Sequence, residues 1–324
     1  MKIQEALEKN HPLLTDGGLE TTFIYDYGFK LPHFAAFIAL QRTPYRKMLK
    51  KYYRSYLDLA VKYKTGFILE SPTWRANTDW GSKLRYTEEE LFHINKSSIY
   101  FLDSIRSEYR DDIDPLLVSG CVGPRSDGYV VGERMSVEEA MSYHYSQLKA
   151  FREGGADMSN AMTMNYVEEA LGIVLSAKDL DLPVVVSFTV ETDGCLPDGN
   201  TLEDAIMDLD WSTGSYPLYY MVNCAHPRHY LSQLHGDSKF LKRIRACRSN
   251  ASCLSHAELD NAEELVRDPL NEYSDSHVLL KSFLPSLHIY GGCCGTDHRN
   301  LEGICDSLLY QHVVEEKKKE SIFI

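Results

Sequence analysis

The sequence has no apolar run approaching the roughly 20 residues of a membrane-spanning helix, and its N-terminal segment MKIQEALEKNHPLL lacks the apolar stretch of a signal peptide. We therefore expect a cytoplasmic protein, whose cysteines stay reduced. Positive charge is also scarce, because 34 lysines and arginines face 47 aspartates and glutamates, giving a formal net charge of -13. This balance argues against nucleic acid or an anionic membrane as a partner.

Low-complexity stretches and linkers are absent as well, so the 324 residues are expected to form one domain, 1–324. Short apolar segments alternate eight times with amphipathic ones, which predicts a single (β/α)8 barrel (TIM barrel) of the α/β class. A doubly wound sheet is the alternative, but TDGGLET lacks the glycine spacing of a dinucleotide-binding turn. The expected strands lie within residues 12–18, 65–72, 114–124, 155–164, 182–191, 216–227, 243–252 and 287–295.

The amphipathic segments predict the helices of the barrel. Thr43 is a candidate N-cap, and Thr87 with Glu90 and Ser136 with Glu139 have the spacing of a capping box. The expected helices lie at residues 43–63, 87–109, 136–151, 165–180, 201–211, 258–270 and 297–319.

Eight cysteines in a reduced protein are expected to be free thiols or metal ligands rather than disulfides. Cys195 lies in a loop rich in glycine and proline, with no neighbour that would make it a ligand. Four others are expected to be small buried residues: Cys121, Cys247, Cys253 and Cys305.

The remaining three cysteines stand where two predicted strands end. Cys224 ends the sixth strand, while Cys293 and Cys294 lie in GGCCG at the end of the eighth. Strand ends of one polarity meet at the active-site face of such a barrel, so the three thiols can converge. Three thiolates suit Zn²⁺ and leave its fourth tetrahedral position open, as in catalytic sites. The alternative is that the adjacent pair are simply small residues at a tight strand end.

The glycines around the pair have a physical reason. Adjacent strand residues point to opposite faces, so both sulfurs reach one metal only where the backbone leaves strand geometry. Gly291, Gly292 and Gly295 permit that departure. A substrate thiol at the open position would lose its proton and stay nucleophilic. Thiol alkylation fits better than water activation, since three anionic sulfurs lower the Lewis acidity of the metal.

Three motifs, TDGGLETTF, VNCAHP and GGCCGTDHRN, resemble the homocysteine S-methyltransferase family of zinc-dependent barrels, and the middle of the chain resembles a bacterial branch. The motifs lie at the first, sixth and eighth strands, so the resemblance covers nearly the whole chain. It implies a homocysteine-binding barrel domain with zinc held by Cys224, Cys293 and Cys294. It also implies that the homocysteine sulfur takes the open position and attacks a methyl donor, giving methionine, as in methionine biosynthesis.

The first motif of the family helps to hold the amino acid part of homocysteine, which maps onto Asp16, Gly17 and Gly18. Backbone N–H groups at glycines can meet a carboxylate, and a carboxylate can meet an ammonium. An ordinary tight turn after the first strand is the alternative.

One position departs from the family pattern. A Glu-Thr pair commonly ends the fourth strand there, and the glutamate contacts the substrate ammonium, whereas Met162 and Thr163 stand here. A thioether cannot pair with an ammonium. Either Glu70 at the second strand or Glu191 at the fifth takes the role, or the thiol acceptor is not homocysteine. Both acids have an alternative as solvated or helix-capping carboxylates.

The expected partners are small molecules, namely homocysteine and a methyl donor, and assembly into a homo-oligomer stays open. No cobalamin- or folate-binding domain fits beside the barrel in 324 residues. We therefore expect S-methylmethionine, S-adenosylmethionine or a betaine-like compound as the donor. The rival hypotheses are a zinc-dependent barrel hydrolase or lyase, and a non-catalytic thiol protein that senses redox state or stores zinc.

Three other features carry weaker expectations. Trp74 and Trp80 follow the second strand, where they could form an aromatic cage for a methylated cation, although loop packing is the simpler role. His226 is expected to cap or orient the loop before Pro227 rather than to bind metal. The C-terminal tail, 314–324, could dock on the barrel, mediate assembly or fray.

Overall fold

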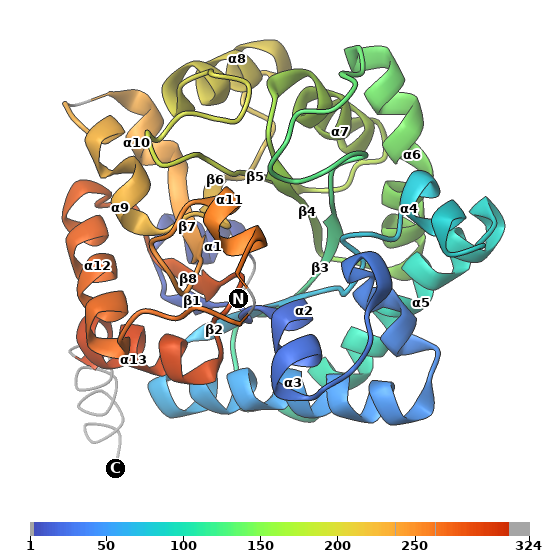
Figure 1. Cartoon of the computed structure of the whole chain (residues 1–324), viewed down its shortest axis with the longest axis horizontal. Coiled ribbons are helices and arrows are strands. Elements are labelled where there is room, and N and C mark those ends of the chain that lie inside the picture. Colours follow the sequence, from blue (N-terminus) through green and yellow to red (C-terminus); the bar gives the residue numbers. More distant parts are fainter. Residues whose placement is uncertain (1–2, 237, 263, 311–324) are drawn as a thin grey trace.

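Eight parallel strands close into a barrel in the computed structural model, which describes residues 3–236, 238–262 and 264–310 (Figure 1). Each strand pairs with the next in sequence, and the first closes on the last through Leu13 with Ile289 and Leu14 with Tyr290. The predicted (β/α)8 fold is confirmed. The strands are β1 (Leu13–Leu14), β2 (Gly66–Glu70), β3 (Leu116–Val122), β4 (Met158–Met164), β5 (Val184–Phe188), β6 (Tyr220–Asn223), β7 (Ile244–Ser249) and β8 (Ile289–Gly292).

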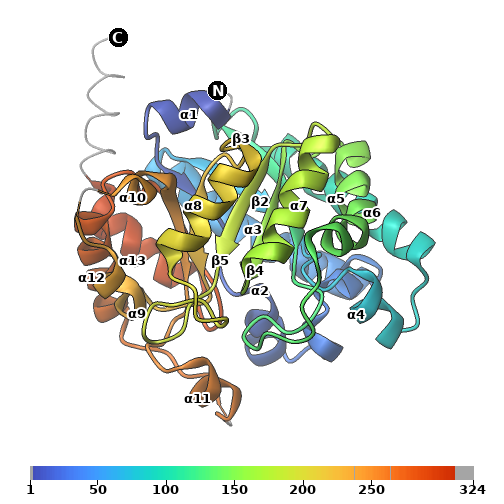
Figure 2. The same ribbon diagram turned by 90° about the horizontal axis from the view of Figure 1, so that it is seen from above.

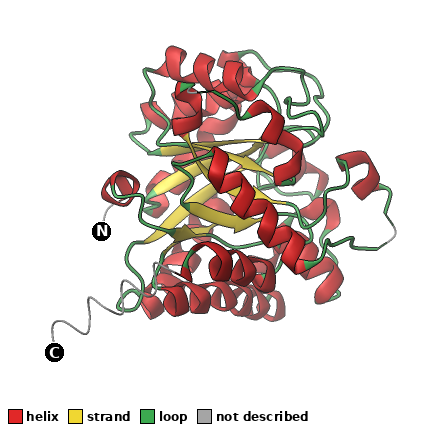
Figure 3. Ribbon diagram, turned by 90° about the vertical axis from the view of Figure 1, so that its left-hand side faces the viewer, coloured by secondary structure: helices red, strands yellow, loops and turns green. Residues whose placement is uncertain are grey.

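Helices ring the strands on all sides, as Figures 1 and 3 show. In the part of the chain that the structure describes, none of them is both long and apolar enough to cross a membrane. The main helices are α3 (Thr43–Tyr63), α5 (Glu88–Tyr109), α6 (Val137–Gly154), α7 (Val167–Asp179), α8 (Leu202–Thr213), α12 (Leu270–Phe283) and α13 (His298–Leu308). The shorter ones are α1 (Ile3–Glu8), α2 (Leu19–Thr21), α4 (Thr78–Lys83), α9 (Pro227–Tyr230), α10 (Lys239–Arg243) and α11 (His256–Asp260).

Two apolar layers hold the barrel together. The larger one lies between the sheet and the surrounding helices, where the apolar faces of helices such as α3 and α5 are buried. The smaller one fills the barrel interior, and α1 contributes Ile3, Ala6 and Leu7 to it beside the inward-facing Leu13 and Ile68. Helix α1 lies at the opposite end of the barrel from α2 and α11 (Figure 2). Helix α1 therefore closes the end of the barrel that carries no predicted site residues.

Local sequence signals set most helix starts. Both predicted capping boxes form, with Thr87 and Ser136 accepting from the backbone N–H of Glu90 and Glu139. The predicted N-cap at Thr43 is wrong by one residue, because Thr43 is already helical. The capping position is Arg42, whose side chain makes no capping hydrogen bond.

The helix expected at 258–270 is wrong. Only the short α11 forms at its start, and the described residues 261–262 and 264–269 form no helix. Part of this segment binds residues beyond neighbouring strand ends instead: Arg267 Nε donates to the carbonyl of Gly295 (2.6 Å), and the Asp268 N–H to that of Ala251 (2.8 Å). The helix that does cover this side is α12, which the apolar pattern does not reveal since its buried face includes serine and histidine. The last helix ends at Leu308, and the predicted tail lies outside the described residues.

His277 on α12 makes this buried face sensitive to acid. Its Nδ1 meets the carbonyl of Tyr273 (2.8 Å) and its Nε2 meets Ser249 Oγ on β7 (3.0 Å). The ring is neutral with Nδ1 donating, and burial lowers the pKa of His277 to about 4. Its contribution to stability is complete above the unfolded value of about 6.5 and is lost as the pH falls toward 4.

We expect the free energy of unfolding to fall by about 3 kcal/mol more in the wild type than in His277→Gln between pH 7 and pH 4. Urea unfolding at a series of pH values measures this difference. Parallel pH curves for the two proteins would show that the ring is not held neutral.

Candidate active site

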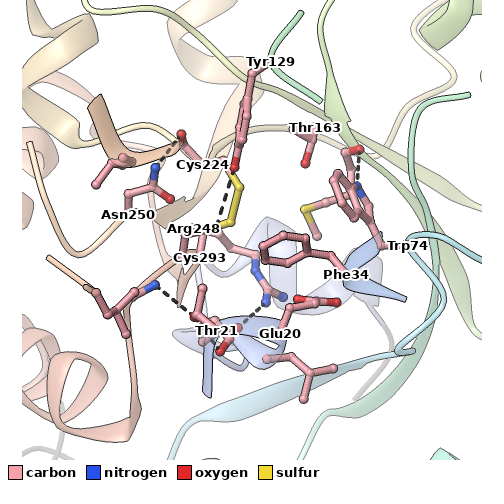
Figure 4. A pocket seen from close by; sticks show the side chains of 18 of the residues that line it. Glu20, Thr21, Phe34, Trp74, Tyr129, Thr163, Cys224, Arg248, Asn250 and Cys293 are labelled. Atoms are coloured by element: carbon pink, nitrogen blue, oxygen red, sulfur yellow. Dashed lines mark hydrogen bonds between the residues drawn. A yellow bond between two sulfur atoms is a disulfide. The ribbon is translucent and has the colours of Figure 1, made fainter. Parts of the chain in front are cut away.

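The three cysteines predicted as ligands converge at the open end of the barrel. Cys224 follows β6 directly, and Cys293 with Cys294 follow β8. Their Sγ atoms all lie within 4.8 Å of one another. They line a cavity of about 440 Å³ at this end of the barrel. Figure 4 shows the cavity with side chains from several strand ends pointing into it.

The backbone leaves strand geometry where the sulfurs must turn toward one point. Cys224 has a left-handed φ of 53°, which is uncommon for a side chain other than glycine. After the cysteine pair, Gly295 has φ of +80° and turns the chain away. Gly292 serves close approach instead, because a Cβ there would lie 2.0 Å from Thr296 Oγ1. The glycines thus provide both an unusual dihedral, at Gly295, and a close approach, at Gly292.

Cys224 and Cys293 are joined as a disulfide, with 2.15 Å between their Sγ atoms. The expectation that all eight cysteines are free thiols or metal ligands is therefore wrong for this pair. The physical reason is the convergence itself, since sulfurs close enough to share a metal are close enough to bond when both are oxidised. The two residues must be reduced before both can act as thiolate ligands.

Cys294 remains a free thiol beside this disulfide. Burial raises its pKa to about 11, and the hydroxyl of Tyr129, 3.6 Å from the sulfur, acts in the opposite direction. A metal would reverse this preference for the protonated form, because coordination requires the thiolate.

The other five cysteines do not belong to this cluster. Cys247 and Cys305 are buried as expected, and Cys121 is buried in the cavity wall. Cys253 is exposed, so the expectation that it is buried is wrong: it lies in the segment after β7, where its N–H donates to Asp268. Cys195 is partly exposed.

Asp16 lies in the cavity wall but already has a cationic partner. Arg248 Nη1 on β7 lies 2.8 Å from Asp16 Oδ1, and the hydroxyl of Tyr52 donates to Oδ2 (3.1 Å). The guanidinium also donates to the carbonyls of Gly17 (3.2 Å) and Gly292 (3.1 Å). Both charged side chains are buried, so this ion pair ties the end of β1 to the ends of β7 and β8.

The two glycines of the first motif pack against the last strand end. A Cβ on Gly17 would lie 2.4 Å from the hydroxyl of Tyr56, and one on Gly18 would lie 2.4 Å from the carbonyl oxygen of Cys293. The Gly18 N–H donates to Thr296. Both glycines line the cavity, and their small size lets the first motif lie against the cysteine pair.

Glu70, at the end of β2, also faces the cavity. Its Oε1 accepts from Asn160 Nδ2 (3.1 Å), while Oε2 is buried without a hydrogen bond among the described residues. Burial raises the pKa of Glu70, opposed by the charge of Arg248. An acceptor oxygen left without a partner in a cavity wall is suited to a donor on a ligand.

Met162 lies on β4 in the cavity wall, where the family pattern has a glutamate. Its carbonyl accepts from the indole Nε1 of Trp74 (3.3 Å), as Figure 4 shows. The predicted aromatic cage is filled by the chain itself: Arg75 stacks between Trp74 and Trp80, with its guanidinium carbon 3.9 and 3.8 Å from the two ring centroids. Loop packing is thus the role of Trp80.

Glu191 does not line the cavity. It lies after β5, where its Oε1 is 3.2 Å from His256 Nδ1. The structure therefore brings Asp16, Gly17, Gly18 and Glu70 to the cavity and leaves Glu191 outside it. His226, as expected, caps α9, and its Nδ1 accepts from the N–H of Arg228 (3.3 Å).

Glu20 is a cavity residue that the sequence reasoning missed. It follows the first motif on α2, and Figure 4 shows its carboxyl group beside Phe34 in the cavity. Burial raises the pKa of Glu20 to about 7, with Asp16 adding to the rise and Arg248 opposing it. Its place four residues after Asp16 in TDGGLET is the signal that could have found it.

A model of the homocysteine S-methyltransferase family matches residues 13–308 of the chain. The chain belongs to this family. It is accordingly a methyltransferase, and family membership supports homocysteine as the methyl acceptor. The recognition of the family from three strand-end motifs is confirmed.

Solved structures agree with the fold. The metallated form of the homocysteine methyltransferase MmuM from Escherichia coli is similar, with 19% identity, a TM-score of 0.70, and 92% of this chain and 97% of that chain covered. The oxidized form of the same enzyme has 18% identity and a TM-score of 0.71 over 93% and 97%. At this identity the likeness concerns the barrel, and the family assignment rests on the sequence match.

Proposed function

We propose that the protein is a zinc-dependent S-methyltransferase that moves a methyl group from a small donor to the thiolate of homocysteine, giving methionine in the cytoplasm. The observation that carries the proposal is the meeting of Cys224, Cys293 and Cys294 within 4.8 Å inside a cavity of about 440 Å³. The whole chain, 1–324, would act as one homocysteine-binding barrel domain.

The sulfur cluster fits zinc by its chemistry. Three cysteines and no histidine or carboxylate make up the group found among the described residues, and thiolates are ligands that zinc prefers. Zinc–sulfur bonds of about 2.3 Å would place three sulfurs roughly 4 Å apart, which lies within the 4.8 Å that encloses the three Sγ atoms. When bound, zinc would lower the pKa of the acceptor thiol so that it is a thiolate at neutral pH.

The chain's own residues would hold the acceptor beside these sulfurs. Glu70 has a buried oxygen that accepts no hydrogen bond from the described residues and could meet the ammonium of an amino acid. We propose Glu70 for that role in place of the glutamate that the family pattern has at the position of Met162. Asp16, Gly17 and Gly18 would complete the wall around the amino acid part. Glu191, which lies outside the cavity, is no longer proposed as a substrate residue.

The cavity also suits a cationic methyl donor. Tyr25, Phe34 and Trp74 supply aromatic surface to its lining, and Glu20 supplies a carboxyl group. Aromatic faces and a carboxylate both favour a sulfonium or quaternary ammonium group. S-methylmethionine, S-adenosylmethionine and betaine-like compounds share this feature.

A thiol other than homocysteine is the second candidate acceptor. Two observations favour it: Met162 cannot pair with an ammonium, and Asp16 is already paired with Arg248. An acceptor thiol without an α-ammonium would not need a carboxylate at the position of Met162, nor an unpaired Asp16.

Zinc-edge X-ray absorption on reduced, zinc-loaded protein tests the acceptor directly. We expect the number of sulfur ligands to rise from three to four when homocysteine is added, because its sulfur takes the open position. Homoserine, which lacks the thiol, is the matched control and should leave three. Three sulfurs unchanged by homocysteine would favour the second acceptor class, and fewer than three in the free protein would contradict the zinc site.

A further inference from the structure

Tyr129 reaches the sulfur cluster from the far side of the cavity. It lies in the segment between β3 and α6, and its hydroxyl oxygen is 3.6 Å from Cys294 Sγ (Figure 4). Either group can donate while Cys294 is a thiol. A metal-bound thiolate has no hydrogen, so the tyrosine O–H must then be the donor.

His256 holds the Tyr129 ring in place. The two rings stack with centroids 4.0 Å apart and an interplanar angle of 20°. His256 lies in the segment after β7, and the contact therefore joins loops from opposite parts of the barrel. We call this pair the Tyr129–His256 stack.

His256 also contacts Cys224, another of the three candidate metal ligands. Its Nε2 lies 2.6 Å from the carbonyl oxygen of Cys224, and its Nδ1 lies 3.2 Å from Glu191 Oε1. A carbonyl and a carboxylate both accept, so each ring nitrogen of His256 faces an acceptor. Glu191 thereby fixes the ring orientation. Asn250 Nδ2 also donates to the Cys224 carbonyl (2.9 Å), which leaves that backbone group firmly held.

We propose that the Tyr129–His256 stack, oriented by Glu191, positions the thiolates of Cys294 and Cys224 and tunes their charge. The inference rests on the proposed metal site and adds to it three positioning residues. The hydroxyl would donate to the Cys294 thiolate, while the imidazole would hold the backbone of Cys224 at its left-handed turn. Ring stacking links the two contacts, so a displacement of Cys294 would also shift Cys224, and the reverse.

The hydrogen bond has a chemical consequence. Three anionic sulfurs reduce the Lewis acidity of a metal, and a donor to one of them withdraws charge from it. The hydroxyl of Tyr129 would in this way increase the polarisation of the acceptor thiol that a bound metal would supply. Partners of metal ligands commonly change metal affinity by about 10–100-fold when they are removed.

The test uses reduced, full-length protein loaded with cobalt(II), whose sulfur-to-metal charge-transfer band reports on thiolate donation. Tyr129→Phe keeps the stacked ring and removes only the O–H. We expect the band to move to lower energy, because the sulfur lone pair is no longer stabilised, and cobalt and zinc affinity to fall about 10-fold. Tyr25→Phe removes a hydroxyl from another tyrosine of the cavity lining and should leave the band and the affinity unchanged.

His256→Gln tests the link between the two contacts. We expect a band shift in the same direction, and a double variant with Tyr129→Phe whose effect is smaller than the sum of the two. His229→Gln is the matched control, since His229 also contacts a carbonyl oxygen, that of Cys253, but has no contact with Tyr129. Circular dichroism and thermal unfolding establish that each variant is folded.

The outcomes are distinguishable. An unchanged band and affinity in folded Tyr129→Phe would overturn the positioning role. A change in KM for a substrate with an unchanged band would overturn it as well, since Tyr129 would then be a substrate contact. Absence of any thiolate–cobalt band in the wild type would instead contradict the proposed metal site itself.

Discussion

Replacing Cys294 with serine is expected to abolish zinc retention and methyl transfer together. A serine hydroxyl is a poor zinc ligand at neutral pH, and two remaining sulfurs cannot maintain a site that three create. We expect zinc affinity to fall by more than about 100-fold, beyond what the loss of an outer partner costs, and turnover to fall to background. Metal analysis after dialysis and an assay of homocysteine methylation measure the two effects.

Cys253→Ser is the matched control for this variant. Cys253 is exposed and does not belong to the sulfur cluster, so zinc content and activity should both stay at the wild-type level. Stability of Cys294→Ser should change by no more than about 1 kcal/mol, because the side chain lies in a cavity wall. Full activity with retained zinc in Cys294→Ser would refute the metal centre.

Replacing Arg248 with methionine is expected to destabilise the barrel by about 3–5 kcal/mol. The substitution removes the cation from Asp16 and leaves a buried carboxylate whose remaining side-chain partner, among the residues that the structure describes, is the Tyr52 hydroxyl. It also leaves the carbonyls of Gly17 and Gly292 without their side-chain donor. Urea unfolding at pH 7 measures the loss.

The double variant Asp16→Asn with Arg248→Met identifies the cause. Removing the unpaired charge should recover most of the lost stability, since the cost comes from an uncompensated buried ion rather than from the missing bond. Arg299→Met is the control, because Arg299 forms an ion pair with Asp297 but is itself largely exposed, and it should cost about 1 kcal/mol or less. Equal losses in the two arginine variants would show that the Asp16 pair does not anchor the strand ends.

The tests on Arg248 bear on substrate recognition as well. If its pairing with Asp16 is kept when an acceptor binds, Asp16 shapes the cavity without meeting the ammonium, and Glu70 carries that contact alone. Glu70→Gln should then raise KM for homocysteine, while an acceptor thiol without an ammonium should be insensitive to the change. This comparison separates the two acceptor classes kinetically.

Local patterns in the sequence determined the architecture and the sulfur site. Alternating apolar and amphipathic segments follow the periods of strands and helices, and eight repeats leave the barrel as the natural closed arrangement. The capping boxes at Thr87 and Ser136 were predictable because they depend on residues three apart. The cysteines were predictable because a strand end is a local feature, and all strand ends of one polarity meet at one face of the barrel.

Contacts between residues at the ends of different strands were decided only by the tertiary structure. The ion pair of Arg248 with Asp16, the hydroxyl of Tyr129 at Cys294 and the contact of Glu191 with His256 each join residues at or beyond the ends of different strands. Helix α12 was not predicted for a related reason. Its buried face is partly polar, and its His277 forms a hydrogen bond with Ser249 on β7. Periodicity records which face of an element is apolar, but the pairing of polar groups depends on which loops the closed barrel brings together. The sequence by itself thus determined the barrel and its three cysteines, and packing at the strand ends decided which charges and rings surround them.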